Sequence, residues 1–190
     1  MSALDFLIFT ISIIGIFLEM WQKPIFWLTY IVAAILLGFQ FWQQQLLGSW
    51  LLQVCYVIMA IFGWYKWLNA DSNEDKLSLR LTIKRQWLNY FLVTILMSYI
   101  LYNVFIYHNA SNPITDAILT SISLVATYMA IYKHISSWFI FAATTLISIP
   151  LYFSHGLYFT ALTYIIFGVL DLIGGFKWLR DYRLKVNTIK

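Results

Sequence analysis

The sequence has little charge and almost no cysteine, and both shortages narrow what this protein can be. Charged residues make up 11% of its 190 residues, against about 25% in soluble domains, whereas hydrophobic residues make up 62%. A soluble protein of this length could not bury so much apolar surface. The one cysteine, Cys55, excludes an intramolecular disulfide. We therefore expect residues 1–190 to form a single transmembrane domain.

Signatures of enzymes are missing as well. The sequence holds no glycine-rich phosphate loop, no His/Cys cluster at metal-ligand spacing and no plausible Ser-His-Asp set. His134 is predicted on the opposite side of the membrane from His108 and His155, so the three histidines are not expected to share a metal. We predict no catalytic site, no metal site and no cofactor. The basic residues are spread over four short segments, which disfavours a nucleic-acid partner.

Long apolar stretches are what the sequence has in abundance. A helix that crosses a bilayer needs roughly 20 apolar residues, and about 17 suffice. Seven stretches meet this requirement: 4–21, 25–42, 46–66, 87–107, 116–132, 136–153 and 157–176. We therefore predict an all-α integral membrane protein with seven transmembrane helices. The N-terminus lacks the basic start and cleavage site of a signal peptide, so the first helix is expected to persist in the mature protein.

The positive charges predict how the chain is oriented. All twelve Lys and Arg residues fall in or beside the gaps that follow the first, third, fifth and seventh stretches. The N-terminus and the other gaps hold none. Positive residues collect on the cytoplasmic side of membranes. This pattern predicts an N-terminus outside and a cytoplasmic C-terminus.

Two similar strings indicate an internal repeat. Residues 63–68 read Gly-Trp-Tyr-Lys-Trp-Leu and residues 174–179 read Gly-Gly-Phe-Lys-Trp-Leu, an offset of 111 residues. The pattern predicts two parallel three-helix repeats, 4–68 and 116–179, joined by a linker helix at 87–107. This 3+1+3 arrangement occurs in transporters, which bind substrate near the midplane between repeats. The alternative is that Gly-x-x-Lys-Trp only marks a membrane edge, since Trp and Lys favour interfaces.

Two ionisable residues, Glu19 and Asp171, lie within the stretches. A charge at the bilayer centre costs at least about 2.5–3.5 kcal/mol and often marks a functional site. Glu19 lies near a stretch end, four residues before Lys23, so we expect a surface ion pair. Asp171 lies deeper, and Lys177 falls on another helix face, so we expect Asp171 to face a central cavity and attract a cation. Because no chain of acidic groups is visible, strong coupling to an ion gradient is disfavoured.

Uncharged polar residues also line up on predicted helix faces. Gln53 and Tyr56 are three residues apart in the third stretch, and Thr120 and Ser123 repeat this spacing in the fifth. A Gln at mid-span needs a partner, either another helix or a ligand. Aromatic rings beside a few hydrogen-bonding groups suit a flat, polar, cationic heterocycle. The alternative for the rings is that they face lipid or form interfacial belts.

The chain resembles the PnuC family of bacterial vitamin transporters over residues 5–180. The matching strings are Leu52-Gln53-x-x-Tyr56, Gly63-Trp64-Tyr65-x-Trp67, Leu119-Thr120-Ser121-Ile122-Ser123-Leu124, Tyr128-Met129, Ser137-Trp138, Leu151-Tyr152 and Gly174-x-x-x-Trp178. The resemblance implies seven helices arranged 3+1+3, a homotrimer and the bacterial inner membrane. It implies facilitated diffusion of a vitamin, which a cytoplasmic kinase phosphorylates and traps. Our candidate substrate-binding residues are Gln53, Tyr56, Trp64, Thr120, Ser123, Trp138, Thr145, Tyr152 and Asp171.

Departures from the family pattern bear on which vitamin is carried. Members that carry nicotinamide riboside usually have Trp-x-x-Trp-x-x-x-Asn in the sixth helix, where this chain has Trp138-x-x-Phe141 and then Thr145. The corresponding Asn of the first half is Ala33 here, and Asp171 replaces a small or apolar residue. Family frequency favours nicotinamide riboside, with thiamine as the alternative. A membrane scaffold or sensor without transport is the alternative from another class.

Overall fold

The computed structural model describes residues 3–43, 47–69, 78–110, 112–154 and 158–188. These residues form seven α-helices, as the apolar stretches predicted: α1 (Ala3–Met20), α2 (Phe26–Gln43), α3 (Leu47–Leu68), α4 (Lys84–Tyr107), α5 (Pro113–Ile131), α6 (Ser136–Ser154) and α7 (Tyr158–Thr188). Six helices within this described part are long and apolar enough to cross a membrane. The apolar part of α6, Ser136–Pro150, is shorter.

One helix extends well beyond its apolar stretch. The first six helices begin and end within three residues of the predicted stretches, but α7 continues from residue 176 to Thr188. Its last turns are polar, and Lys177 Nζ lies 2.7 Å from Asp181 Oδ2, an (i, i+4) ion pair that supports a helix outside the apolar region. Hydropathy therefore located the span but not the end of the helix.

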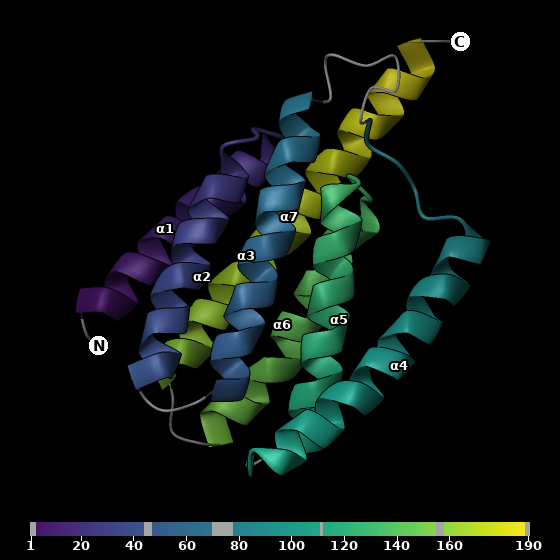
Figure 1. Ribbon diagram of the computed structural model, residues 1–190. Helices are drawn as coiled ribbons and strands as arrows, with labels where there is room; N and C mark the ends of the chain where they lie inside the picture. Colours follow the sequence, from purple (N-terminus) through teal and green to yellow (C-terminus); the bar gives the residue numbers. More distant parts are fainter. Residues whose placement is uncertain (1–2, 44–46, 70–77, 111, 155–157, 189–190) are drawn as a thin grey trace.

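Six of the helices form a closed ring. Each packs against the next in the order α1, α2, α3, α5, α6, α7, and α7 packs against α1. The remaining helix, α4, lies outside the ring and packs against α5 (Figure 1). Most of its residues are exposed, with Phe105 the one buried side chain among those described in this helix. The order of contacts means that residues from both halves of the chain surround the ring's centre.

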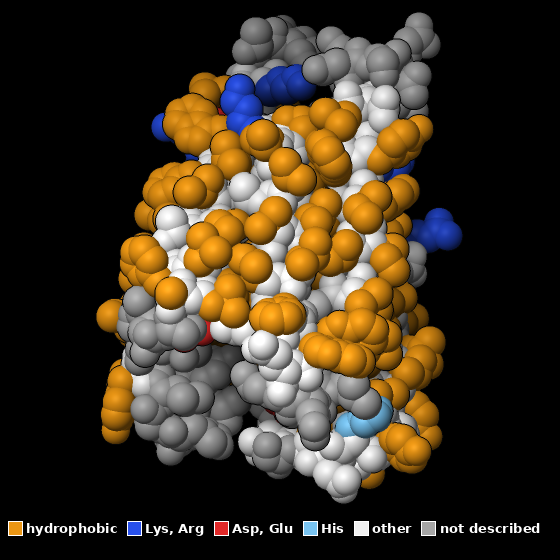
Figure 2. Space-filling model, turned by 60° about the vertical axis from the view of Figure 1, so that its left-hand side comes forward, with side chains coloured by type: hydrophobic (Ala, Val, Ile, Leu, Met, Phe, Trp, Pro, Cys, Tyr) orange, Lys and Arg blue, Asp and Glu red, His pale blue; other side chains and the backbone are white. Residues whose placement is uncertain are grey.

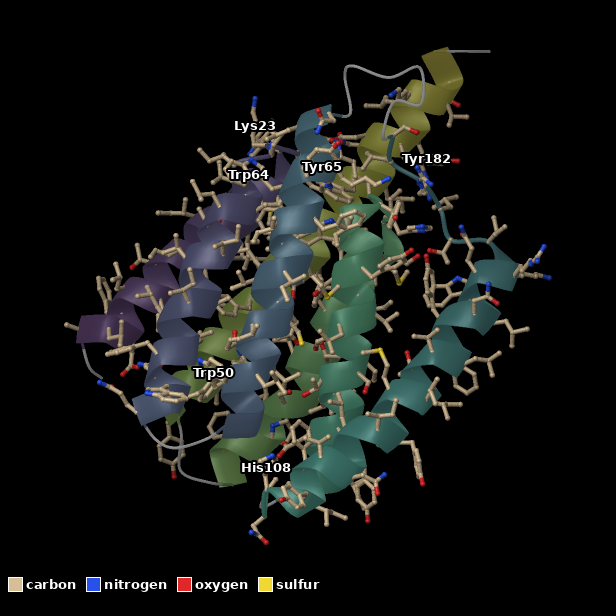
Figure 3. All side chains as sticks on the ribbon, viewed as in Figure 1. Lys23, Trp50, Trp64, Tyr65, His108 and Tyr182 are labelled. Carbon is tan, nitrogen blue, oxygen red and sulfur yellow. The ribbon has the colours of Figure 1, made fainter. Side chains whose placement is uncertain are left out.

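Most of the described Lys and Arg residues lie toward one end of the bundle. This is the end at which α1, α3, α5 and α7 finish, whereas hydrophobic side chains cover the middle of the visible face (Figure 2). Lys23, Trp64 and Tyr65 lie at this end, and Trp50 and His108 lie near the other (Figure 3). Apolar middles with aromatic ends fit a bilayer and its interfaces. Which end faces the cytoplasm stays a prediction.

Four tryptophans fill the core at the charged end. Trp67 lies between Trp27 and Trp178, with ring centroids 5.6 Å and 6.1 Å away, and Trp138 lies 5.4 Å from Trp178. Trp27, Trp138 and Trp178 are at most 1% exposed. Large rings that pack edge to face bury much apolar area and hold the helices in one geometry. This tryptophan cluster closes the ring at its charged end.

Hydrogen bonds of the cluster join the two halves of the ring. The indole N–H of Trp67 donates to the carbonyl oxygen of Ile131 (3.0 Å), and that of Trp178 donates to the carbonyl oxygen of Met20 (3.2 Å). Trp178 is offset from Trp67 by 111 residues, and Ile131 from Met20 by the same number. These matched contacts support the repeats 4–68 and 116–179, which we retain as a proposal.

Close packing of helix backbone on the cluster predicts a glycine requirement. A methyl group at Gly174 would overlap the ring of Trp138, whereas at Gly168 the nearest atom would lie at an ordinary 3.5 Å. Gly174→Ala should therefore lower the free energy of unfolding by about 1–3 kcal/mol through overpacking. Gly168→Ala should leave it unchanged or raise it by up to about 1 kcal/mol, because Ala favours helix. Thermal unfolding in detergent tests this, and equal unfolding temperatures for the two variants would contradict it.

The segment before α4 is docked on the turn between α5 and α6. The N–H of Arg80 donates to the carbonyl oxygen of Lys133, and the N–H of Ile135 donates to the carbonyl oxygen of Arg80, both at 3.1 Å. Between these bonds lies His134, whose Nδ1 is 3.0 Å from Thr82 Oγ1. The bonds tie the linker to the second half of the ring.

The docked histidine predicts a dependence on pH. Burial, and then the charge of Arg80, lowers the pKa of His134 from 6.5 to about 4. Its contribution to stability is therefore complete above pH 6.5 and is lost as the pH falls from 6.5 toward 4. Over this range the amides of Arg80 and Ile135 should lose protection from hydrogen exchange, after correction for intrinsic rates. His134→Gln should remove the pH dependence, and constant protection in the native chain would contradict the prediction.

Candidate substrate-binding cavity

A cavity of about 330 Å³ lies at the centre of the ring. All six ring helices contribute residues to its lining. Most of these lining residues are polar or aromatic, in contrast to the apolar outer faces of the helices. The polar or aromatic lining residues are Ser12, Glu19, Phe26, Trp27, Thr29, Tyr30, Gln53, Tyr56, Ser123, Thr127, Phe141, Thr145, Phe167 and Asp171. Such a mixture of rings and few polar groups is typical of sites for small molecules.

A second cavity of similar volume adjoins the first between α3, α5, α6 and α7. The residues common to both linings are Tyr56, Ser123, Phe141, Thr145 and Phe167. The second cavity adds hydroxyl and carboxyl groups from the N-terminal half of α5 and the C-terminal half of α6, including Asp116, Thr120 and Ser148. The two cavities therefore share a wall, and together they extend from the centre of the ring toward the end at which α5 begins.

Helical spacing explains why these polar groups face inward. On α1, Ser12, Gly15 and Glu19 are three and four residues apart, so they share one helix face, and all three line the central cavity. Across the ring, Tyr30 lies within hydrogen-bonding reach of Thr127, and Tyr56 of Ser123. Polar side chains that cannot be solvated by lipid pair with other helices or with a ligand.

Six of the residues selected from the sequence line one or both of these cavities. Gln53 and Asp171 line the central cavity, Thr120 lines the second, and Tyr56, Ser123 and Thr145 line both. Ala33, which stands where the family pattern has an Asn, lines the central cavity too. The spacing of polar residues on predicted helix faces was therefore an effective guide to the lining.

Two other selected residues lie elsewhere, and the side chain of a third is not described. Trp138 belongs to the tryptophan cluster, Trp64 packs against that cluster while half-buried, and neither lines the two cavities. The side chain of Tyr152 lies outside the described residues. The cavities thus give no support to Trp64 and Trp138 as substrate contacts, and their place in the motifs fits packing of the core.

The surface ion pair expected for Glu19 is wrong. Glu19 is 7% exposed and lines the central cavity. Helix α1 ends at Met20, and Gln22 has a positive φ of 55°, so Lys23 does not follow Glu19 along a helix. The (i, i+4) rule applies only within a helix. The spacing of Ser12, Gly15 and Glu19, which places them on one helix face, could have indicated that Glu19 points into the protein.

Glu19 and Asp171 therefore share one cavity. They lie close enough for their charges to repel each other, and among the described residues no ion pair joins either one to a Lys or Arg. Trp27 lines the same cavity, is fully buried, and its indole N–H has no hydrogen-bond acceptor among the described residues. A buried charge and a buried donor without partners are unfavourable, and a ligand in the cavity would satisfy both.

Comparisons with known proteins agree with this architecture. Residues 2–180 match the family described as nicotinamide mononucleotide transporter. The chain is 27% identical over 179 residues to the nicotinamide riboside transporter PnuC of Escherichia coli (strain K12), covering 80% of this chain and 75% of that protein. It is 26% identical over 172 residues to the riboflavin/roseoflavin transporter RibM of Streptomyces davaonensis, covering 87% and 78%.

A solved structure shares the fold. The crystal structure of the vitamin B3 transporter PnuC superposes with a TM-score of 0.73 and 17% sequence identity, covering 95% of this chain and 83% of that one. The match of the family over nearly the whole chain, the similar relatives and the ring of helices around a polar cavity lead to one conclusion. The chain belongs to the nicotinamide mononucleotide transporter family and is a multi-pass membrane transporter, not an enzyme.

Proposed function

We propose that this protein carries nicotinamide riboside across the bacterial inner membrane by facilitated diffusion through the central cavity. The observation that carries the proposal is the composition of that cavity, in which two buried carboxyl groups face aromatic rings, an amide and several hydroxyls. Nicotinamide riboside combines a flat pyridinium cation, a carboxamide and ribose hydroxyls. Each of these parts has a matching partner in the lining.

Each group of side chains has a defined role in the proposal. Asp171 and Glu19 attract the pyridinium charge, and the rings of Tyr30 and Phe141 offer faces for stacking and cation–π contact. The amide of Gln53 offers donors and an acceptor, which complement a carboxamide. Hydroxyls on α5 and α6 of the second cavity would bind the ribose and guide it toward the centre.

The driving force lies outside the transporter in this proposal. The vitamin moves down its own gradient, and a cytoplasmic kinase phosphorylates it so that it cannot return. We further propose the orientation that the charges predict, with the N-terminus outside, and a homotrimer. The resemblance to the PnuC family supports the trimer and the trapping.

Thiamine is the second candidate substrate. It is also a flat cation, so the paired carboxyls favour it as they favour nicotinamide riboside. Thr145 and Ala33, in place of two amide side chains, leave fewer groups to bind a carboxamide. Riboflavin, for which the relative RibM is named, is uncharged and offers no positive charge to a pair of carboxyls. Competition of unlabelled vitamins with labelled nicotinamide riboside separates the three.

Replacing the mid-span amide should weaken transport. Gln53→Leu keeps the approximate volume but removes the hydrogen-bonding groups from the central cavity, so binding should weaken by about 0.5–1.5 kcal/mol, roughly two- to tenfold. The measurement is the apparent KM for uptake of nicotinamide riboside, with expression and oligomer size checked. Gln43→Leu is the matched control, since Gln43 is exposed at the end of α2. An unchanged KM for Gln53→Leu would return Gln53 to a structural role.

Purified protein in liposomes should equilibrate its substrate without concentrating it. With equal pH on both sides and an imposed inward sodium gradient, labelled nicotinamide riboside should reach equal concentrations and then stop. Nicotinamide riboside kinase and ATP enclosed in the liposomes should raise the retained label, because the phosphorylated product cannot leave. Accumulation driven by sodium without the kinase would contradict facilitated diffusion.

A further inference from the structure

The two carboxyl groups of the central cavity present a problem of charge that the proposed function does not solve. Glu19 comes from α1 and Asp171 from α7, which are neighbours in the ring. Their residues are 7% and 8% exposed, and their charges repel. Two negative charges held together away from water are strongly unfavourable unless something neutralises one of them.

The residues that line the cavity from the other ring helices do not supply a positive charge. The titratable ones among them are Tyr30 of α2 and Tyr56 of α3. Lys133 does not line the cavity, and it contacts Gln22 and the ring of Trp67. Lys177 pairs with Asp181. Among the described residues, then, two carboxyls line the cavity and no Lys or Arg does.

A separate observation concerns a hydrogen-bond donor of the same cavity. The indole N–H of Trp27, which lines the cavity, is buried without an acceptor among the described residues. Of the other buried tryptophans, Trp67 and Trp178 donate to carbonyl oxygens, whereas the indole N–H of Trp138, which lines neither cavity, also has no acceptor among the described residues. A ligand that brings both a positive charge and an oxygen acceptor would satisfy the carboxyls and the indole together.

We propose that Glu19 and Asp171 share one proton while the cavity is empty and release it to water when a cationic vitamin binds. The inference rests on the proposed function, because it needs a cationic substrate. The charges balance: an empty pair with one proton carries a net charge of −1, and two carboxylates with a monocation also carry −1. The proton and the vitamin compete for the pair, so acid weakens binding. With equal pH on the two sides the exchange adds no driving force, so the vitamin still moves down its own gradient.

Titration calorimetry of the purified protein with nicotinamide riboside tests the exchange. At neutral pH, measurements in two buffers with different ionisation enthalpies should give heats that differ by an amount equal to about one proton released per vitamin. The dissociation constant should rise by up to about tenfold for each unit of acidification where the pair is protonated. Reduced nicotinamide riboside, an uncharged molecule of nearly the same shape, should release no proton if it binds.

Substitutions identify the groups that hold the proton. Glu19→Gln and Asp171→Asn keep the shapes of the side chains and leave one buried carboxyl without a like-charged neighbour, so it should hold a proton less tightly than the pair does. Each variant should bind nicotinamide riboside with less proton release at neutral pH and with its pH dependence shifted toward acid. The control is Asp181→Asn, which removes a carboxylate from the same helix outside the cavity and should behave as the native chain. Size-exclusion profiles confirm that each variant is folded.

The outcomes separate this inference from the proposed function. Binding of nicotinamide riboside or thiamine with equal heats in the two buffers and no pH dependence would overturn the proton exchange and leave the function standing. Proton release that persists unchanged in both single variants would overturn the assignment to this pair. If the folded protein binds riboflavin but neither cation, the proposed function and the inference both fall.

Discussion

The absence of water from the core of a bilayer is the constraint on which the whole structure depends. Seven apolar helices satisfy their backbone hydrogen bonds internally, but their few polar side chains must find partners inside the protein. In this chain many of those side chains lie on the inner faces of six helices, which close into a ring around a cavity. The same constraint that folds the protein therefore also produces a binding site.

The charged end of the ring is fixed by packing and the cavity is left free to bind. Trp67 and Trp178 each donate a hydrogen bond across the boundary between the two halves, and glycines such as Gly174 let helix and indole approach closely. Beside this rigid cluster, Glu19 and Asp171 line the cavity without an ion pair to Lys or Arg among the described residues, and the indole N–H of Trp27, a member of the cluster, has no acceptor among them. A folded chain that leaves such groups without partners gains free energy when a suitable ligand enters, and this favours selectivity for a cation with oxygen acceptors.

Much of this structure followed from the sequence because hydrophobic length and helical spacing are local properties. They located the seven helices and placed Gln53, Tyr56, Ser123, Thr145 and Asp171 on the lining. Glu19 was misassigned because its surroundings depend on where α1 ends, which hydropathy does not determine. Trp64 and Trp138 stand in motifs whose residues pack as well as bind, and only the tertiary contacts distinguish the two roles.

The central claim is that the ring encloses a site for a cationic vitamin beside Glu19 and Asp171. A structure of the protein with nicotinamide riboside bound tests it most directly. The account predicts the pyridinium ring in the central cavity, with both carboxyl groups in contact with the cation and the Trp27 N–H bonded to a ligand oxygen. A vitamin bound outside the ring, or within it but away from the two carboxyl groups, would contradict the account.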